Sequence, residues 1–101
     1  MLNNKSILIT GGTGSFGTKF VETVIKKYPK IKKLIIFSRD ELKQHEMSNR
    51  FSEKNYKFLR YFLGDIRDEK RIKVALKSVD YVIHAAALKQ VPKAEYNPFE
   101  Y

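Results

Sequence analysis

The chain has 101 residues, of which 43% are hydrophobic, so one small domain with a well-packed core is expected and disorder is not. It contains no cysteine, which excludes disulfide bonds and thiolate metal sites. Its 20 basic and 11 acidic side chains give a net charge of +9, which would suit a nucleic-acid partner if the charges gathered on one face.

Four short apolar runs alternate along the chain with three amphipathic segments. We predict strands over residues 6–10, 33–38, 57–63 and 81–85, with helices over residues 15–28 and 40–51 and a third helix that follows Asp68 and carries Val79 on its apolar face. The alternation predicts an α/β fold: a Rossmann-type parallel sheet of four strands in the order 3-2-1-4, with right-handed crossovers and helices on both faces. Residues 1–101 would form the N-terminal part of a dinucleotide-binding domain, and the fourth strand would be an edge that further strands cover in a longer protein.

The first helix is expected to turn one apolar face toward the sheet. The side chains of this face recur every three or four residues: Phe16, Phe20, Val21, Val24, Ile25 and Tyr28. Pro29 ends the pattern. The densest group of lysines, in residues 26–33, follows the helix and precedes the next strand, where cations suit the helix dipole. We therefore expect a solvated basic face and no nucleic-acid binding.

A glycine-rich turn joins the first strand to the first helix. Glycines at positions 11, 14 and 17 form a G-x-x-G-x-x-G variant of the dinucleotide-binding fingerprint. Gly11 would permit the tight turn, Gly14 would let a pyrophosphate approach the backbone, and Gly17 would let the helix pack closely on the strand. The helix start would add N–H groups and the positive end of its dipole. A purely structural turn is the alternative.

Polar and charged side chains follow the second strand. NAD enzymes usually carry an acidic residue here, which binds the ribose 2′-hydroxyl. In this chain Ser38 and Arg39 come first, and Lys43 lies one helical turn beyond Asp40. A hydroxyl and a guanidinium suit a 2′-phosphate in charge and geometry, so we predict NADP as the cofactor. Two alternatives stay open: a solvated Arg39 beside a capped helix, and Asp40 as a ribose acceptor.

The ends of the third and fourth strands add further candidates. Asp65 would accept a hydrogen bond from the adenine amine while Ile66 covers the ring; alternatively, Asp65 caps the helix at Asp68. The small residues 85–87 would let the backbone pass beside the nicotinamide ribose, unless they serve only to fill space. Lys89 would reach a phosphate or a substrate sugar, unless it is a surface lysine.

Other chemistries have no pattern in this sequence. His84 lies within the fourth strand, where we expect a core histidine rather than a catalytic one, and His45 is expected to be exposed. We find no metal-ligating constellation, no carboxylate pair at catalytic spacing and no nucleophile elbow. The apolar run after the first residues is too short for a signal peptide or a membrane span, so we expect a soluble, cytoplasmic protein without a membrane partner.

Four segments together resemble the N-terminal part of a known family. They are TGGTGSFG (residues 10–17), SRDELK (38–43), GDIRD (64–68) and HAAALK (84–89), followed by Val91-Pro92 and Glu95-Tyr96-Asn97-Pro98. In this order they look like the soluble inverting UDP-N-acetylglucosamine 4,6-dehydratases, which are extended short-chain dehydrogenase/reductase proteins of bacterial polysaccharide and flagellin-sugar synthesis. The resemblance covers the whole chain, and its main departure is a longer, lysine-rich loop around residues 54–60.

The resemblance implies a reaction and a set of binding residues. In the family, NADP takes a hydride from C4 of the nucleotide sugar UDP-N-acetylglucosamine, water is eliminated across C5 and C6, and the hydride returns at C6 with C5 inverted. The implied cofactor residues are Thr13, Gly14, Ser15 and Phe16 for the pyrophosphate; Ser38, Arg39, Asp40, Glu41, Leu42 and Lys43 for the adenosine phosphate; Asp65 and Ile66 for adenine; Ala86 for the cofactor; and Lys89 for cofactor or substrate.

The resemblance also implies what the chain lacks. In the family a Thr-Asp-Lys segment and a Tyr-x-x-x-Lys pair carry the chemistry, and neither occurs in these 101 residues; Tyr96 and Tyr101 have no lysine four positions later. We therefore expect no catalytic residue here, but the cofactor-binding part of a longer, homo-oligomeric enzyme. The alternatives are part of a sugar-nucleotide epimerase, a non-catalytic NADP-binding or interaction domain, and a basic nucleic-acid binder.

Overall fold

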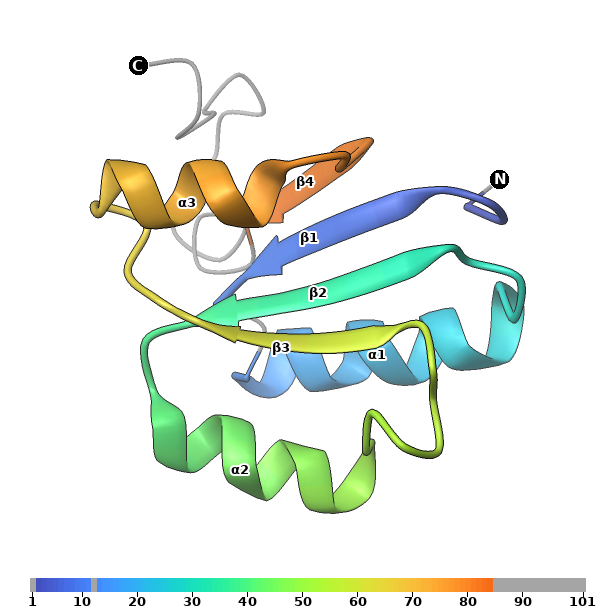
Figure 1. Ribbon diagram of the computed structural model, residues 1–101. Coiled ribbons are helices and arrows are strands. Elements are labelled where there is room, and N and C mark those ends of the chain that lie inside the picture. The colour runs from blue at the N-terminus through green and yellow to red at the C-terminus, as the bar shows by residue number, and fades with distance from the viewer. Residues whose placement is uncertain (1, 12, 85–101) are drawn as a thin grey trace.

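Four parallel strands form one sheet, with helices on both of its faces (Figure 1). The computed structural model describes residues 2–11 and 13–84. Its elements, in chain order, are β1 (Ser6–Thr10), α1 (Ser15–Lys27), β2 (Lys33–Ser38), α2 (Glu41–Arg50), β3 (Leu59–Leu63), α3 (Glu69–Leu76) and β4 (Tyr81–His84). The strands lie in the order β3-β2-β1-β4, and every neighbouring pair is parallel, which confirms the predicted Rossmann-type sheet.

Each face of the sheet has its own hydrophobic core. Helices α1 and α2 cover one face and α3 covers the other (Figure 1). Alternate residues of β1 divide between them: Ile7 and Ile9 belong to the core with Val21 of α1, whereas Leu8 belongs to the core with Ile72 of α3. Because both faces are covered, β1 is buried at every position, as a parallel strand in the middle of a sheet must be.

Side-chain caps fix where two of the helices begin. The Asp40 carboxylate accepts a hydrogen bond from the Lys43 backbone N–H at 3.0 Å, and the Asp68 carboxylate accepts one from the Arg71 N–H at 3.2 Å. The longest helix, α1, has 13 residues and ends where the Tyr28 N–H donates to the Val24 carbonyl. Among the described helices, none combines the length and the apolar character that a membrane span requires.

Two element boundaries differ from the sequence prediction by more than one residue. β3 begins at Leu59 rather than at residue 57, because the Leu59 N–H donates to the Tyr56 carbonyl at 2.9 Å and holds the preceding residues in a turn. α3 ends at Leu76, before Val79, because Ser78 has a φ of 64° and leaves the helical region. Val79 still packs against the core on this face.

One side chain of the predicted apolar face of α1 is not turned inward. Phe16 is 36% exposed at the first turn of the helix, and it stacks on Phe20 with 6.4 Å between ring centroids. The remaining members of that face are buried or pack against the core. Residue 85, the expected last residue of the fourth strand, lies outside the described residues.

Candidate functional site

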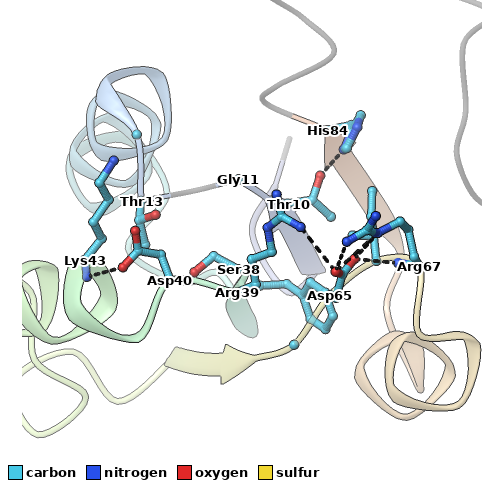
Figure 2. Close-up of a pocket in the computed structure, with 14 residues that line it drawn as sticks. Thr10, Gly11, Thr13, Ser38, Arg39, Asp40, Lys43, Asp65, Arg67 and His84 are labelled. Atoms are coloured by element: carbon cyan, nitrogen blue, oxygen red, sulfur yellow. Dashed lines mark hydrogen bonds and ion pairs between the residues drawn. The ribbon is translucent and has the colours of Figure 1, made fainter.

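A pocket of about 600 Å³ lies at the carboxyl ends of the strands (Figure 2). Its walls follow all four strands, with these lining residues: Thr10, Gly11, Thr13 and Gly14; Phe37, Ser38, Arg39, Asp40 and Lys43; Gly64, Asp65, Ile66 and Arg67; and His84. The pocket extends from the ends of β1 and β4 along the ends of β2 and β3. Its volume is within the range of small-molecule sites.

The glycine turn has the geometry that the motif predicts. Gly11 has a φ of 68°, in the left-handed region that favours glycine, and its N–H donates to the Phe37 carbonyl at 3.1 Å. Gly14 is the N-cap of α1, and being a glycine it places no side chain over the first turn. A Cβ atom built on Gly14 would lie 3.7 Å from the Gly11 carbonyl oxygen, an ordinary contact. The fold itself therefore leaves room at Gly14, so the absence of a side chain there suits a ligand.

The end of β2 brings a hydroxyl and two cations to the pocket. Ser38 is the last residue of the strand and is 9% exposed, whereas Arg39 is exposed. Asp40 caps α2, as one of the alternatives proposed, and it also lines the pocket, as does Lys43. Thr13, Asp40 and Lys43 lie together on one side of the pocket, with Arg39 and Asp65 at its centre (Figure 2).

A residue that the sequence did not single out holds the end of β2 in place. Gln44 of α2 is 8% exposed, and its Nε2 donates to the Ser38 hydroxyl oxygen at 2.9 Å and to the Ser38 carbonyl at 3.3 Å. The same Nε2 donates to the Phe62 carbonyl of β3 at 3.2 Å. Gln44 therefore ties the carboxyl ends of β2 and β3 to helix α2.

The Asp65 carboxylate is shared by two arginines. Arg67 Nη2 lies 2.8 Å from Asp65 Oδ2, and Arg39 Nη1 lies 3.4 Å from the same oxygen (Figure 2). The Arg67 backbone N–H also donates to Asp65 Oδ1 at 2.9 Å. The hydrogen bonds from Arg67, with the charge of Arg39, hold the pKa of Asp65 well below its usual range. Since Asp68 caps α3, the alternative role of the Asp65 carboxylate as that cap is wrong.

His84 lies at the pocket and not in the core. It is half-buried at the end of β4, lines the pocket, and forms a hydrogen bond between its Nδ1 and Thr10 Oγ1 (Figure 2). Burial lowers the pKa of His84 below the ordinary value, so the neutral imidazole is favoured at neutral pH. The predicted placement of His84 in the core is therefore wrong.

The pocket unites most of the predicted cofactor residues. Nine of the described candidates line it: Gly11, Thr13, Gly14, Ser38, Arg39, Asp40, Lys43, Asp65 and Ile66. Five further described candidates lie on the first turns of α1 and α2 and are not among its lining residues: Ser15, Phe16, Gly17, Glu41 and Leu42. Ala86 and Lys89 lie outside the described residues.

Five of the lining residues were not predicted as site residues from the sequence. They are Thr10, Phe37, Gly64, Arg67 and His84. Arg67 was within reach of sequence reasoning, because it lies two positions after Asp65 in the segment that follows β3. With Arg39 and Lys43 it gives the pocket three cationic side chains beside the carboxylates of Asp40 and Asp65. An excess of positive charge, next to an open glycine turn, fits a ligand that carries several phosphate groups.

Comparison with known proteins places the chain in a family. A model of the family described as "Polysaccharide biosynthesis protein" matches residues 7–101. The chain is 58% identical over 100 residues to a UDP-N-acetylglucosamine 4,6-dehydratase (inverting) of Campylobacter jejuni, and 48% identical over 102 residues to a UDP-glucose 4-epimerase of Rickettsia akari. Each match covers 99% of this chain and 29% of the relative, so the chain spans less than a third of their length.

Solved structures show the same fold. The chain is similar to the X-ray structure of Pen from Bacillus thuringiensis, with 41% identity and a TM-score of 0.77 over 99% of this chain and 30% of that one. It also shares the fold of a dTDP-glucose 4,6-dehydratase from Bacillus anthracis, solved with NAD, at 23% identity and a TM-score of 0.66, over 79% of this chain and 26% of that one. With the family match over residues 7–101, the chain belongs to the polysaccharide biosynthesis protein family.

Proposed function

We propose that the pocket at the carboxyl ends of the strands binds NADP. The observation that carries the proposal is the pair Ser38 and Arg39, which occupies the end of β2 next to the open glycine turn. At this place an acidic residue would favour the ribose hydroxyls of NAD, whereas a hydroxyl and a guanidinium match a 2′-phosphate.

The lining residues divide naturally among the parts of a dinucleotide. The turn at Thr13 and Gly14 would hold the pyrophosphate, at the start of α1. Ser38, Arg39 and Lys43 would hold the 2′-phosphate. When bound, the nicotinamide supplies hydride transfer, and the role of this chain is to bind and orient it.

Asp65 and Ile66 remain the candidates for the adenine. The Asp65 carboxylate accepts hydrogen bonds from Arg39 and from Arg67, so an adenine amine would share it with these partners. Ile66 lines the pocket beside it and would cover one face of the ring. An adenine lying here would have the Arg39 and Arg67 guanidiniums beside it, which suits stacking of a planar cation on a base.

For the complete protein we propose a sugar-nucleotide 4,6-dehydratase that inverts C5 of UDP-N-acetylglucosamine. The support is the 58% identity to a relative of that name, which covers 99% of this chain. The chain itself would lack the chemistry, because it contains neither the Thr-Asp-Lys segment nor the Tyr-x-x-x-Lys pair of the family. We infer a cytoplasmic, homo-oligomeric enzyme, with Ala86 and Lys89 in contact with cofactor or substrate.

The test is product analysis on the complete natural protein that contains this sequence. Incubation with UDP-N-acetylglucosamine and NADP should give a 4-keto-6-deoxy sugar nucleotide with inverted C5, identified by NMR. A C4 epimer would favour the second candidate, an epimerase, which the 48% identity to the Rickettsia akari protein supports. NADP binding without turnover of either kind would indicate a non-catalytic domain. DNA binding that falls steeply with salt and survives Gly14→Ala would indicate the basic nucleic-acid binder.

A further inference from the structure

Gln44 is a buried polar side chain directly behind the pocket. It lies on α2, is 8% exposed, and is not among the residues that line the cavity. Its Nε2 reaches three oxygens: the Ser38 hydroxyl at 2.9 Å, the Ser38 carbonyl at 3.3 Å and the Phe62 carbonyl at 3.2 Å. The shortest of the three contacts is the one to the hydroxyl.

These partners determine the orientation of the Gln44 side-chain amide. Backbone carbonyls only accept hydrogen bonds, so the atom that faces those of Ser38 and Phe62 must be the amide nitrogen. The amide nitrogen of glutamine carries two hydrogens and accepts none. Two hydrogens serve three oxygens here, so one hydrogen is shared between two of them, and at the third contact the Ser38 hydroxyl oxygen is the acceptor.

The proton of the Ser38 hydroxyl is consequently directed away from Gln44. Within residues 2–11 and 13–84, Ser38 Oγ has no hydrogen-bond partner besides Gln44. Ser38 is only 9% exposed, and it lines the pocket. The Ser38 hydroxyl can thus donate its hydrogen to a bound ligand, while Gln44 occupies one of its two lone pairs. A donor in this state prefers an anionic oxygen, because charge-assisted hydrogen bonds are about twice as strong as neutral ones.

We propose that Gln44 is a positioning residue for cofactor selection, which turns the Ser38 hydroxyl into a dedicated donor to the 2′-phosphate of NADP. The inference rests on the proposed function, since it needs a phosphate at this end of β2. Gln44 would act through Ser38 and make no contact with the cofactor. Its substitution should therefore change the preference for NADP over NAD more than it changes the affinity for NAD.

A double-mutant cycle on the complete natural protein tests this role. The Kd values for NADP and NAD are measured by calorimetry for the wild type, Gln44→Met, Ser38→Ala and the double variant. Ser38→Ala should lower the NADP-to-NAD preference about tenfold, the size expected for a hydrogen bond to a charged group. Gln44→Met should lower it about threefold to tenfold. In the Ser38→Ala background, Gln44→Met should leave the preference unchanged.

A matched control separates positioning from loosening of the helix. Met47 is buried on α2 one turn from Gln44, and Met47→Ala weakens the same helix contact without touching Ser38. This variant should keep the wild-type preference. If Gln44→Met yields no folded protein, Gln44→Asn replaces it, because an amide one methylene shorter cannot reach the three oxygens.

The possible outcomes separate a failure of the proposed NADP binding from a failure of the positioning role of Gln44. A wild type without preference for NADP would overturn the proposed function. A wild type that prefers NADP, together with a Gln44 variant that keeps this preference, would overturn only the positioning role. The positioning role also fails if the Gln44 substitution lowers the preference equally in the presence and absence of the Ser38 hydroxyl, or if Met47→Ala lowers it as much.

Discussion

Arg39 and Asp65 form an ion pair at the centre of the pocket, with 3.4 Å between Arg39 Nη1 and Asp65 Oδ2, although 26 positions separate them in the chain. Arg67 binds the same carboxylate oxygen from the other side at 2.8 Å. One carboxylate thus orients two guanidiniums that come from the ends of β2 and β3. A 2′-phosphate that binds Arg39 has to share this guanidinium with Asp65.

Arg39→Glu should weaken NADP binding much more than NAD binding. The substitution replaces a phosphate partner by a repelling charge, and it also adds a second carboxylate beside Asp65. We expect the NADP affinity to fall by about a hundredfold or more, the scale of a lost charged hydrogen bond plus new repulsion. Equilibrium titration of both cofactors checks this result.

The matched control for this charge reversal is Lys27→Glu. Lys27 is the exposed last residue of α1. That helix runs from the carboxyl ends of the strands, where the pocket lies, toward their amino ends (Figure 1). Lys27→Glu changes the net charge by the same amount as Arg39→Glu, but away from the pocket. The ratio of NADP affinity to NAD affinity should therefore stay unchanged. Equal losses of NADP and NAD in Arg39→Glu would contradict the 2′-phosphate assignment.

Asp65→Asn should remove a small, acid-sensitive contribution to stability. Hydrogen bonds from Arg67 and the charge of Arg39 lower the folded-state pKa of Asp65 below its ordinary value of about 3.9. A depressed carboxylate pKa stabilises the folded state above the unfolded-state pKa, and the effect is lost as the pH falls through the folded-state pKa. The gap in melting temperature between wild type and variant should be constant near neutrality and narrow below about pH 4. A gap that stays constant from pH 7 to pH 2 would refute this coupling.

His84 should remain neutral at physiological pH in the folded protein. Burial lowers its pKa, so its NMR titration midpoint should fall below the ordinary value of about 6.5. Because the folded state binds this proton less tightly than the unfolded state, the contribution to stability is present above about pH 6.5 and lost as the pH falls through the folded-state pKa. The His45→Gln variant identifies the His84 resonance. A midpoint above 6.5 would show that the imidazolium is favoured instead.

Gly64→Ala should destabilise the fold. A Cβ atom at Gly64 would lie 2.8 Å from Arg71 Cγ and 2.9 Å from Phe37 Cζ. The Phe37 ring is 1% exposed and stacks on Phe62, which restricts its movement. Overpacking of this kind costs about 1–3 kcal/mol, which chemical denaturation would measure. An unchanged free energy of unfolding would mean that the ring is free to shift.

Gly14→Ala should weaken dinucleotide binding and leave the stability of the fold almost unchanged. Among the described residues, the added methyl group meets only the Gly11 carbonyl oxygen, at 3.7 Å, and the φ of −79° is one that alanine adopts readily. The free energy of unfolding should therefore change little. Dinucleotide affinity should fall by at least about tenfold, because the methyl group occupies the approach of the pyrophosphate. Full affinity for both cofactors in this variant would place the phosphates elsewhere.

The positions of the central strands and the starts of the capped helices could be predicted because their causes are local. The apolar runs of β1 and β2 mark strands covered on both faces, and Asp40 and Asp68 each lie three residues before the N–H that they cap. The start of β3 could not be predicted, since hydrogen bonds within the turn at Tyr56, and not the apolar pattern, decide it. Prediction therefore succeeded where an apolar run or a capping side chain marks the boundary in the sequence itself.

The candidate site likewise contains residues that the sequence reveals and residues that only the structure reveals. Gly11, Ser38 and Arg39 lie at or directly after strand ends, a position that sequence alone reveals. Gln44 belongs to a mostly polar helix, and only its distance to the Phe62 carbonyl on another strand distinguishes it from its neighbours. For His84 the choice between core and pocket depends on the register of β4 against β1, which no local pattern encodes.

The pairing of Thr10 with His84 has a consequence for how the protein acquires its site. The two residues face each other in the β1–β4 register across 74 positions of sequence, so the chain must close a very long loop before they meet. Contacts of such separation form slowly. The three strands β1, β2 and β3 can assemble through shorter loops. The side of the pocket at His84 would then form after the sides that follow β1, β2 and β3 are already in place.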